Sequence, residues 1–393
     1  MPRLAGSSKL LRAMNESAAL AHLLERGQLT RNDLRELTGL SKPTISEALR
    51  RLADAGLASV VGHVSAGPGP NAEVYAANPD AAYTVAVSVR DTVGTDGPAL
   101  AVAGCDLTGN IRGRVEAEVD LARTDPATAV ADAVARLHRE TGVPTGRIGH
   151  VQIGVTGAYD ARTGTIHHVD VPGWSRPGLV RELRERLRTE VGVDNDVNLA
   201  AMAERSHGVG VHVDGFALLW LGASGLGLAI DLGGVLLRGA RGGAGEIGYM
   251  PVHTPGGGGS RLNLHNLISG PAVRALAGEF GFTGRTPAEA LATAVAAGND
   301  AATRFLAALA DRIAVGLAAV VAVLDPGLVV LAGEVGRAGG TALRHAVTAA
   351  MARAAPPLVT SIAVTSIDGD AVLLGALDAG LAAVREALIG VKG

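Results

Sequence analysis

Residues 30–56 contain two short helical patterns separated by a glycine turn, and this feature constrains the fold of the 393-residue chain more than any other. In the first pattern Thr30 can cap the helix and Asp33 can complete a capping box, while Leu34 and Leu37 face inward. Gly39 supplies the turn, because glycine tolerates the left-handed backbone found at helix ends. Two short helices joined in this way predict helix-turn-helix geometry.

The second pattern begins at Ser41, which can cap it, and has Pro43 in its first turn, where a missing amide costs little. One face of this helix is apolar and is expected to pack inward, through Ile45, Ala48, Leu49 and Leu52. The opposite face has short hydroxyl side chains near its start and arginines farther along. Hydroxyls can meet bases or phosphates, and arginines can hold the phosphate backbone, so we predict that this face binds DNA.

The flanking segments complete a compact module over residues 1–78. An amphipathic helix is expected before the two patterns, with Leu10, Leu11, Met14, Ala18, Ala21 and Leu24 at helical spacing. After them, Ala58–Val64, a loop rich in Gly and Pro, and Glu73–Ala76 predict a β-ribbon, or wing. The predicted DNA-contacting residues are Arg31, Ser41, Lys42, Thr44, Ser46, Glu47, Arg50, Arg51, Gly69 and Asn71. The alternative is a small helical module for protein interaction or dimerisation.

Charge is distributed unevenly along the chain. Residues 1–63 have a net charge of +3, while the rest carries −6 of the total of −3. A basic end on an acidic body suggests a polyanionic partner for that end alone. The single cysteine, Cys105, excludes a disulfide framework and suits a reducing compartment. No leader and no uncharged stretch of about 20 residues is evident, so we expect a soluble cytoplasmic protein without a membrane segment.

Beyond Asn78-Pro79, which we interpret as a linker, β-rich runs alternate with helical patterns and predict an α/β body. The expected strands are 84–89, 99–106, 148–155, 215–221, 225–232 and 328–332. The expected helices lie near residues 125–140, 176–190, 197–206, 270–280, 287–298, 300–323, 341–354 and 370–388.

Four segments of this body, in their order along the chain, resemble the ROK family of bacterial sugar kinases and sugar-responsive repressors. They are VQIGVTGAYDARTGTIHHVDVPGW (151–174), VDNDVNLAAMAE (193–204), LLRGARGGAGEIGYMPV (236–252) and LDPGLVVLAGEV (324–335). The resemblance implies a two-lobed, actin-like (ribonuclease H-like) sugar-kinase fold. We expect lobe I to comprise residues 79–195 and 370–393, and lobe II residues 196–369. The helix-turn-helix in front matches the repressor branch of the family.

The resemblance also implies an effector site, for which we predict Gly157, Asp170, Asn195, Asp196, Glu246, Tyr249 and His265. In the kinases, the Asn-Asp pair matching Asn195-Asp196 binds sugar hydroxyls and the Asp acts as general base. A carboxylate suits this task because it accepts two hydroxyl hydrogen bonds. Alternatively Asp196 caps the helix that begins at Val197, and it could do both.

Zinc-binding members of the family have a histidine where this chain has Tyr249, and then three cysteines. Here the corresponding loop has no cysteine, and the family's following glutamate aligns with His265. A closed zinc site needs about four Cys or His ligands. His253 and His265 alone cannot supply them, so we predict no metal and no cofactor.

The nucleotide-binding turns also depart from the family. ROK kinases hold phosphates and Mg²⁺ with an Asp-x-Gly-x-Thr turn, and Ser88 stands at the Asp position here. The second phosphate turn, 222–225, keeps its glycines and lacks the threonine. Without a carboxylate to organise Mg²⁺, phosphoryl transfer loses its main electrostatic stabiliser. We therefore predict a sensor with a degenerate kinase fold and no enzymatic activity.

These expectations combine into a homodimeric or homotetrameric regulator, most simply a repressor, that binds a palindromic operator in double-stranded DNA. The expected effector is a sugar or sugar phosphate that closes the lobes. The loss of a negative charge at His265 and the nearby Arg238, Arg241 and Arg261 favour the phosphate; the alternative is that these arginines sit on a solvated surface. Two rival functions remain open: a DNA-tethered sugar kinase, and a regulator that answers to a protein partner and no longer senses a sugar.

Overall fold

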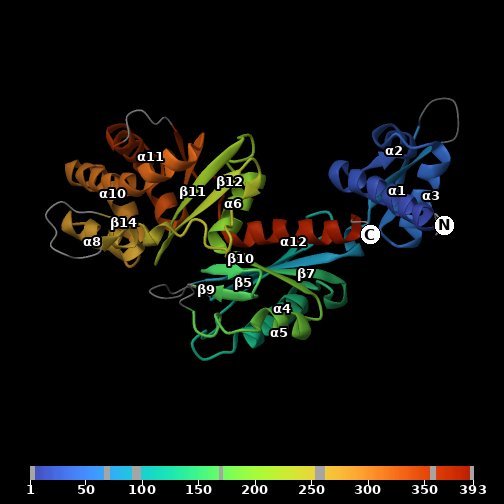
Figure 1. The fold of residues 1–393 in the computed structure, drawn as a ribbon, viewed down its shortest axis with the longest axis horizontal. Helices are drawn as coiled ribbons and strands as arrows, with labels where there is room; N and C mark the ends of the chain where they lie inside the picture. Colours follow the sequence, from blue (N-terminus) through green and yellow to red (C-terminus); the bar gives the residue numbers. More distant parts are fainter. Residues whose placement is uncertain are drawn as a thin grey trace.

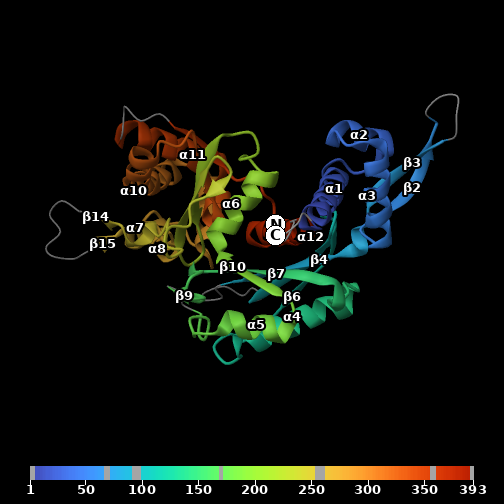
Figure 2. The ribbon, with the colours of Figure 1, turned by 45° about the vertical axis from the view of Figure 1, so that its right-hand side comes forward.

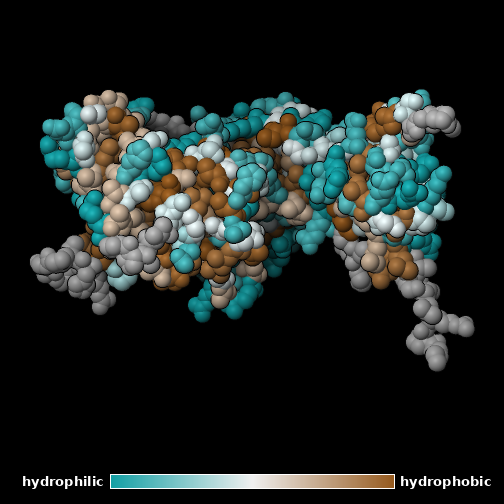
Figure 3. Space-filling view, turned by 90° about the horizontal axis from the view of Figure 1, so that it is seen from above, coloured by the Kyte–Doolittle hydropathy of each residue, from teal (hydrophilic) through white to brown (hydrophobic). Residues whose placement is uncertain are grey.

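The computed structural model describes residues 5–65, 71–90, 99–167, 171–252, 262–354 and 360–389. The molecule is elongated, with the N-terminal module at one end and a two-lobed body filling the rest of its length (Figures 1 and 3).

The N-terminal module is a winged helix-turn-helix, as predicted. It contains α1 (Ala5–Arg26), α2 (Arg31–Thr38) and α3 (Lys42–Asp54), followed by the wing strands β2 (Ala58–Val64) and β3 (Ala72–Ala77). A two-residue strand, β1 (Leu29–Thr30), joins the far side of β3, giving the sheet order β1-β3-β2.

The sequence signals at the helix ends of this module are confirmed. Thr30 and Asp33 form a complete capping box on α2, and Gly39 ends that helix at φ 70°. The Ser41 side chain caps α3 by accepting a hydrogen bond from the Thr44 amide. The four residues predicted on the inner face of α3 are all buried: Ile45, Ala48, Leu49 and Leu52.

The predicted inner face of α1 was wrong in the first half of the helix, although Leu24 packs against the module core. Leu10, Leu11 and Met14 are 43%, 56% and 50% exposed, whereas Leu20 and Leu23 are buried in the module core. The two faces lie on nearly opposite sides of the helix, and a leucine- and alanine-rich helix offers apolar residues at helical spacing on both. Which face packs is decided by where α3 and β3 contact α1, information that periodicity does not contain.

Lobe I is built on a five-stranded sheet with the order β10-β7-β4-β5-β6. The strands are β4 (Tyr83–Val89), β5 (Leu100–Asp106), β6 (Ile111–Ala117), β7 (Ile148–Val155) and β10 (Glu190–Asn195). Strands β4, β5 and β6 pair antiparallel, while β7 and β10 run parallel to β4. Helices α4 (Pro126–Thr141) and α5 (Leu179–Leu187) cover one face, and α12 (Ala371–Ile389) lies on the other (Figures 1 and 2).

Lobe II repeats this topology with the order β13-β12-β11-β16-β17. Its strands are β11 (Gly215–Leu221), β12 (Leu226–Leu232), β13 (Val235–Leu236), β16 (Leu328–Ala332) and β17 (Ser361–Val364). The first three pair antiparallel and the last two run parallel to β11, as in lobe I. Two sheets of identical order and direction are the arrangement expected for the predicted actin-like fold. The predicted fold class is therefore confirmed.

Four α-helices on lobe II match the predicted positions: α8 (Gly270–Glu279), α9 (Pro287–Ala297), α10 (Asp300–Leu324) and the second half of α11 (Gly333–Ala354). The helix α11 begins eight residues earlier than predicted, and a non-helical Gly340 (φ 50°, ψ −142°) kinks it there. A short helix, α7 (Leu264–Ile268), was not predicted. By length and hydropathy, α10 could span a membrane, but many of its side chains, including Phe305 and Ile313, are buried in the lobe II core.

Helix α6 (Asp196–His207) follows β10 and packs against α12 and against β12, between the two sheets. The remaining short elements are the 3₁₀ turns 79–81, 145–147 and 247–249 and the strand pairs β8 (Ala158–Asp160) with β9 (Thr165–His167) and β14 (Pro251–Val252) with β15 (Leu262–Asn263). The predicted lobe boundaries, 79–195 with 370–393 and 196–369, stay predictions.

Candidate functional site

The polar face of α3 is the candidate nucleic-acid interface, and its charges are mutually paired. Glu47 accepts hydrogen bonds from the guanidinium groups of both Arg50 and Arg51, at 2.8 Å each. Arg50 also donates to Asp54 at 2.7 Å, and Arg51 lies 3.5 Å from Glu16. The two arginines hold the pKa of Glu47 down to about 2, so this carboxylate is ionised at any physiological pH.

The hydroxyl groups on the same face have local partners. Ser41 and Thr44 share a hydrogen bond of 2.8 Å between their side chains, and the Ser46 hydroxyl donates to the Lys42 carbonyl. Lys42 and Asn71 are exposed, at the start of α3 and beside the wing strand β3. Gly69, the other predicted wing contact, lies outside the described residues.

Arg31 occupies a different position from the rest of the predicted interface. Its guanidinium donates to Glu73 at 2.8 Å and to the Tyr75 hydroxyl at 2.7 Å, and it lies 5.8 Å from the centre of the Tyr75 ring. These contacts fasten α2 to wing strand β3. The sequence did not indicate this role, because Glu73 and Tyr75 are more than forty residues away.

A cavity of about 760 Å³ lies between the two sheets of the body. It opens where the parallel strands of both lobes end, and it is lined by the ends of β4, β7, β10, β11 and β16. Ligands of open α/β sheets bind in such crevices at the carboxyl ends of strands. The volume falls in the range of small-molecule sites.

Every predicted effector residue that the structure describes lines this cavity: Gly157, Asn195, Asp196, Glu246, Tyr249 and His265. Asp170 lies outside the described residues. Gly157 follows β7, Asn195 ends β10 and Asp196 begins α6. Glu246 and Tyr249 precede β14, and His265 lies on α7, so the set spans about a hundred positions of the chain.

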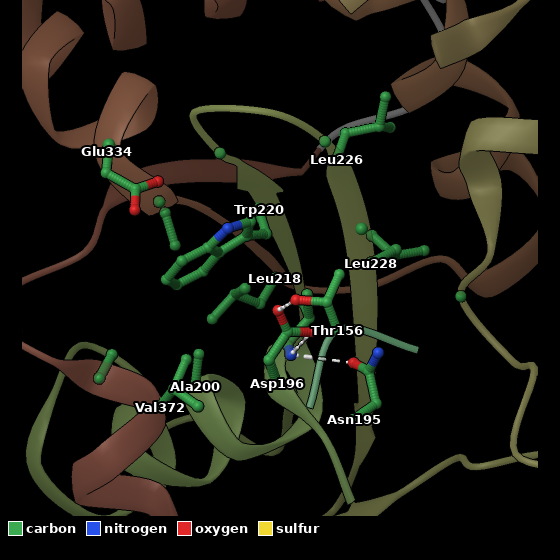
Figure 4. A pocket seen from close by; sticks show the side chains of 18 of the residues that line it. Thr156, Asn195, Asp196, Ala200, Leu218, Trp220, Leu226, Leu228, Glu334 and Val372 are labelled. Carbon is green, nitrogen blue, oxygen red and sulfur yellow. Dashed lines mark hydrogen bonds between the residues drawn. The ribbon is translucent and has the colours of Figure 1, made fainter. Parts of the chain in front are cut away.

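Asn195 and Asp196 are held rigidly at the junction of β10 and α6 (Figure 4). Asn195 caps α6 by accepting hydrogen bonds from the Val197 and Asn198 amides, and it donates to the Gly157 carbonyl at 3.1 Å. The alternative that Asp196 caps this helix was wrong: the capping residue is Asn195, and Asp196 is the first residue of the helix. The Asp196 carboxylate accepts from the Thr156 hydroxyl at 3.2 Å.

The Asp196 carboxyl is tuned to change charge near neutral pH. Burial, together with the negative charges of Glu246 and Glu334, raises its pKa to about 7, and the hydrogen bonds from Val197 and Thr156 oppose that rise. A carboxyl with a pKa near 7 can accept a proton from a sugar hydroxyl or hydrogen-bond to it. The geometry therefore supports recognition of hydroxyl groups at Asp196.

Trp220, on β11, forms the apolar wall of the cavity beside Asp196. Its indole lies above Leu218 and faces the side where Ala200 and Val372 project (Figure 4). It packs against the core clusters of both lobes. The chain has two tryptophans, and the other, Trp174, is buried in lobe I. Sequence reasoning missed Trp220, which stands inside a continuous apolar strand and looks like any core residue.

The end of the cavity near Ser88 differs from a phosphate-binding turn. Ser88 is buried at the end of β4, and Arg90 follows it. The Arg90 guanidinium donates to Asp370 at 2.6 Å and to Glu116 at 3.2 Å. Cavity-lining residues at this end that we did not predict are Arg90, Arg114, Glu334, Arg337 and Asp370. They come from four separate segments, and no local motif marks them.

The arginines expected to favour a phosphate are placed differently from the prediction. Arg238 donates two hydrogen bonds to one oxygen of Asp194, at 2.7 and 2.9 Å, and joins lobe II to β10. Neither Arg238 nor Arg241 lines the cavity, and Arg261 lies outside the described residues. For Arg238 and Arg241 the expected placement was wrong, because sequence proximity to Glu246 does not fix the side on which a loop residue projects; the preference for a phosphate stays a prediction.

The donor set does not fit the zinc ion that some members of the family bind. Tyr249 replaces a histidine, and the one cysteine, Cys105, is buried in β5. Within the described ranges, no group of three or more His, Cys, Asp or Glu side chains could hold a metal ion. His253 lies outside those ranges.

Two protein-family models match the chain, and they divide it as the structure does. The model of the MarR family matches residues 11–65, and that of the ROK family matches residues 93–382. Among curated proteins, the bifunctional enzyme NanE/NanK of Brucella suis is 35% identical over 202 residues, which is 51% of this chain and 36% of that protein. The xylose repressor of Bacillus subtilis is 22% identical over 251 residues, covering 62% of this chain and 61% of that protein.

Solved structures agree with this division. The structure described as a ROK family transcriptional regulator, homolog of E. coli MLC protein, superposes with a TM-score of 0.74 over 97% of this chain and 98% of that one, at 18% identity. The ROK hexokinase from Thermus thermophilus is 28% identical, with a TM-score of 0.60 over 75% of this chain and 96% of that one. Since the ROK model matches well over half of its residues, the chain belongs to the ROK family and has a MarR-type winged helix-turn-helix at its N-terminus.

Proposed function

We propose that this protein is a DNA-binding transcriptional regulator of sugar or amino-sugar metabolism, and that a sugar bound in the cavity controls it without being phosphorylated. The observation that carries the proposal is the joining of two sites in one chain: a winged helix-turn-helix, and a kinase-type cavity that keeps Asn195, Asp196 and Glu246. The similarity to a xylose repressor and to a regulator structure of nearly the same length supports it.

The DNA-binding part of the proposal rests on α3 and the wing. In a two-fold symmetric dimer or tetramer, paired α3 helices would lie in successive major grooves of a palindromic operator. Arg50 and Arg51 would exchange Glu47 for DNA phosphates, while Thr44 and Ser46 would meet base edges. Such a regulator works in the cytoplasm, where the operator is.

The sensing part rests on the floor of the cavity. Asn195, Asp196 and Glu246 would hold ring hydroxyls, with Tyr249 and His265 adjusting selectivity at the rim. The xylose repressor among its relatives makes D-xylose the first sugar to test, and the hexokinase makes hexoses, such as D-glucose, the next. Repression is the simplest mode, with the sugar releasing DNA.

The rival function is a DNA-tethered sugar kinase, which is supported by the similarity of the body to a ROK hexokinase. Against it, Ser88 offers no carboxylate for Mg²⁺, and the Arg90–Asp370 ion pair occupies the same end of the cavity. A regulator that answers only to a protein partner is a third candidate, raised by the altered Tyr249 and His265 positions.

The test starts from genomic DNA fragments of the source organism, captured by the full-length protein and sequenced. We expect enrichment of a palindrome beside sugar-metabolism genes, with weaker binding to it in the presence of one sugar of a panel containing D-xylose, D-glucose and N-acetyl-D-glucosamine. Sugar-dependent ADP formation from Mg-ATP by the wild type would replace the proposal with the kinase. Enrichment without any sugar response would leave the partner-controlled regulator.

A further inference from the structure

Helix α12 connects the cavity to the DNA-binding module. Its first residues, Ala371 and Val372, line the cavity together with Asp370, which precedes them. Its last residues, Leu388 and Ile389, pack against the core of the winged helix-turn-helix. At 1.5 Å per residue, its 19 residues span roughly 28 Å. Figure 1 shows it lying between the lobes and the module.

The cavity end of α12 is fixed by an ion pair and a cap. The Asp370 carboxylate accepts a hydrogen bond from the Leu373 amide through one oxygen and from Arg90 through the other, at 2.9 and 2.6 Å. Arg90 extends from the end of β4, which is the position of the phosphate-binding turn in the kinases. A ligand that entered this end of the cavity would therefore meet the ion pair that holds the start of α12.

The middle of α12 packs with its backbone directly against its neighbours. A Cβ atom placed on Gly375 would lie 1.8 Å from the Leu199 carbonyl oxygen on α6, and one on Gly380 would lie 2.2 Å from the Thr84 hydroxyl on β4. Contacts this close leave little room for α12 to slide over α6 and β4, since packed interiors have few voids. A displacement of α12 is therefore shared with these neighbours and is not absorbed within the helix.

The far end of α12 contacts both the module and lobe I. Leu388 and Leu24 of α1 pack against the same small cluster of buried residues, and Arg385 donates to the carbonyl of Leu107 in lobe I at 3.0 Å. The linker is itself held, because the Asn78 amide and side chain donate to the carbonyls of Leu57 and Gly56, at 2.9 and 2.8 Å. On the other side, the Pro79 carbonyl accepts a hydrogen bond from the Leu107 amide at 3.1 Å, so the linker is bonded to both the module and lobe I.

We propose that α12 is the element through which occupancy of the cavity changes the affinity of the module for DNA, with the Arg90–Asp370 pair at one end and the Leu388 contact at the other. The inference rests on the proposed function, since it needs both a DNA site and a cavity ligand. A ligand that competes for the Arg90–Asp370 ion pair tilts α12. The tilt then shifts the surface against which α1 packs. Because the two sites share one rigid element, DNA must affect the cavity as the cavity affects DNA.

The test is a double-mutant cycle on DNA affinity in the full-length protein, using a duplex selected by the wild type from a random pool. Asp370→Asn removes the charge and keeps a helix cap, since Asn caps as well as Asp. Leu388→Ala weakens the contact at the other end, and Glu386→Gln, an exposed position on the same turns of α12, is the matched control. Thermal unfolding verifies that each variant folds, and Arg90→Gln replaces Asp370→Asn if the latter does not.

We expect Asp370→Asn to weaken DNA binding about fivefold, the lower end of allosteric couplings. The same substitution in the Leu388→Ala background should have less than about a twofold effect, while Glu386→Gln should leave the fivefold effect intact. Equal effects in both backgrounds would overturn the proposal, because independent sites are additive. A wild type that selects no duplex would instead defeat the proposed function, so the two failures are distinguishable.

A second readout runs in the reverse direction. Trp220 lies in the cavity, and Trp174→Phe leaves it as the only tryptophan of the chain. We expect the selected duplex to change the fluorescence of Trp220 in Trp174→Phe, and Leu388→Ala to abolish most of that change. Fluorescence that stays constant while DNA binds would count against α12 as the connection.

Discussion

The hydroxyl of Thr156 donates a hydrogen bond to the carboxylate of Asp196 at 3.2 Å, on the floor of a cavity where burial, together with the negative charges of Glu246 and Glu334, raises the pKa of Asp196 to about 7. The raised pKa means that the folded protein disfavours the ionised form of Asp196. Such a displaced pKa marks Asp196 as a candidate functional residue. Groups with strongly displaced pKa values cluster at functional sites.

The first prediction concerns stability and pH. Between the ordinary pKa of 3.8 and the folded value of about 7, the unfolded chain ionises Asp196 while the folded chain keeps its proton. The contribution of Asp196 to the free energy of unfolding therefore falls as pH rises through this window and stays constant above it. Asp196→Asn removes the loss, so its gain in melting temperature should be larger at pH 8 than at pH 4.5 by at least about 2 °C, the effect of roughly 2 kcal/mol in a protein of this size.

Comparing the two proteins at each pH cancels the titration of all other groups. Thr156→Val is the companion variant. Without the hydroxyl that stabilises its charged form, the pKa of Asp196 should rise further, and the destabilisation should continue to higher pH than in the wild type. A gain for Asp196→Asn that is the same at both pH values would contradict the assigned pKa.

The second prediction concerns Glu47. Because it pairs with both Arg50 and Arg51 and stays ionised, it competes with DNA phosphates for them and repels the backbone itself. Glu47→Gln should therefore raise the affinity for any duplex. Arg50→Ala and Arg51→Ala should each lower it and reduce the slope of log K against log salt by about one. Fluorescence anisotropy with labelled duplexes at several salt concentrations measures all three.

Thr44→Ala serves as the contrast, since it should change preference among sequences and leave the salt slope unaltered. Wild-type affinity in the Arg50→Ala, Arg51→Ala double variant at physiological salt would place DNA on another surface.

The third prediction is that Mg-ATP turnover with any hexose stays at background, and that Ser88→Asp does not restore it. The substitution supplies the missing carboxylate but leaves Arg90 bound to Asp370 at the same end of the cavity. A coupled assay for ADP, with a ROK hexokinase as positive control, gives the answer. Turnover in the wild type that disappears in Asp196→Asn would revive the kinase.

The fourth prediction concerns the ligand. A sugar at a hundred times its dissociation constant stabilises the folded state by about 2.7 kcal/mol, which shifts the melting temperature by a few degrees. The shift should appear with one sugar of the panel for the wild type and be lost in Asp196→Ala. Glu386→Gln, far from the cavity floor, should respond like the wild type. An equal response in Asp196→Ala would show that the sugar binds elsewhere.

Local signals predicted the winged helix-turn-helix well because its determinants are local. A capping residue, its partner three positions later and a glycine at the end of a helix act within one turn, as at Thr30, Asp33 and Gly39. The same holds for the buried face of α3. The face of α1 was wrong because two apolar stripes compete there and only tertiary contacts choose between them.

In the body, strands with continuous apolar runs were predicted to within a residue or two, whereas β6, β10 and β17 were not predicted. Strand β6 is an edge strand with polar residues on its outer face, and β10 contains charged and glycine residues. At the cavity, Asn195, Asp196 and Glu246 were found through family motifs. Trp220, Arg90 and Asp370 were not, since the fold brings them together from distant segments.

The central claim is that one chain binds DNA and answers to a sugar in its kinase-type cavity. The most direct measurement is the dissociation constant of the full-length protein for its captured duplex, determined by anisotropy with and without each sugar of the panel, for the wild type and Asp196→Ala. We predict that one sugar weakens DNA binding by the wild type at least about fivefold and leaves Asp196→Ala unaffected. DNA affinity that is indifferent to every sugar, or an equal response in Asp196→Ala, would contradict the account.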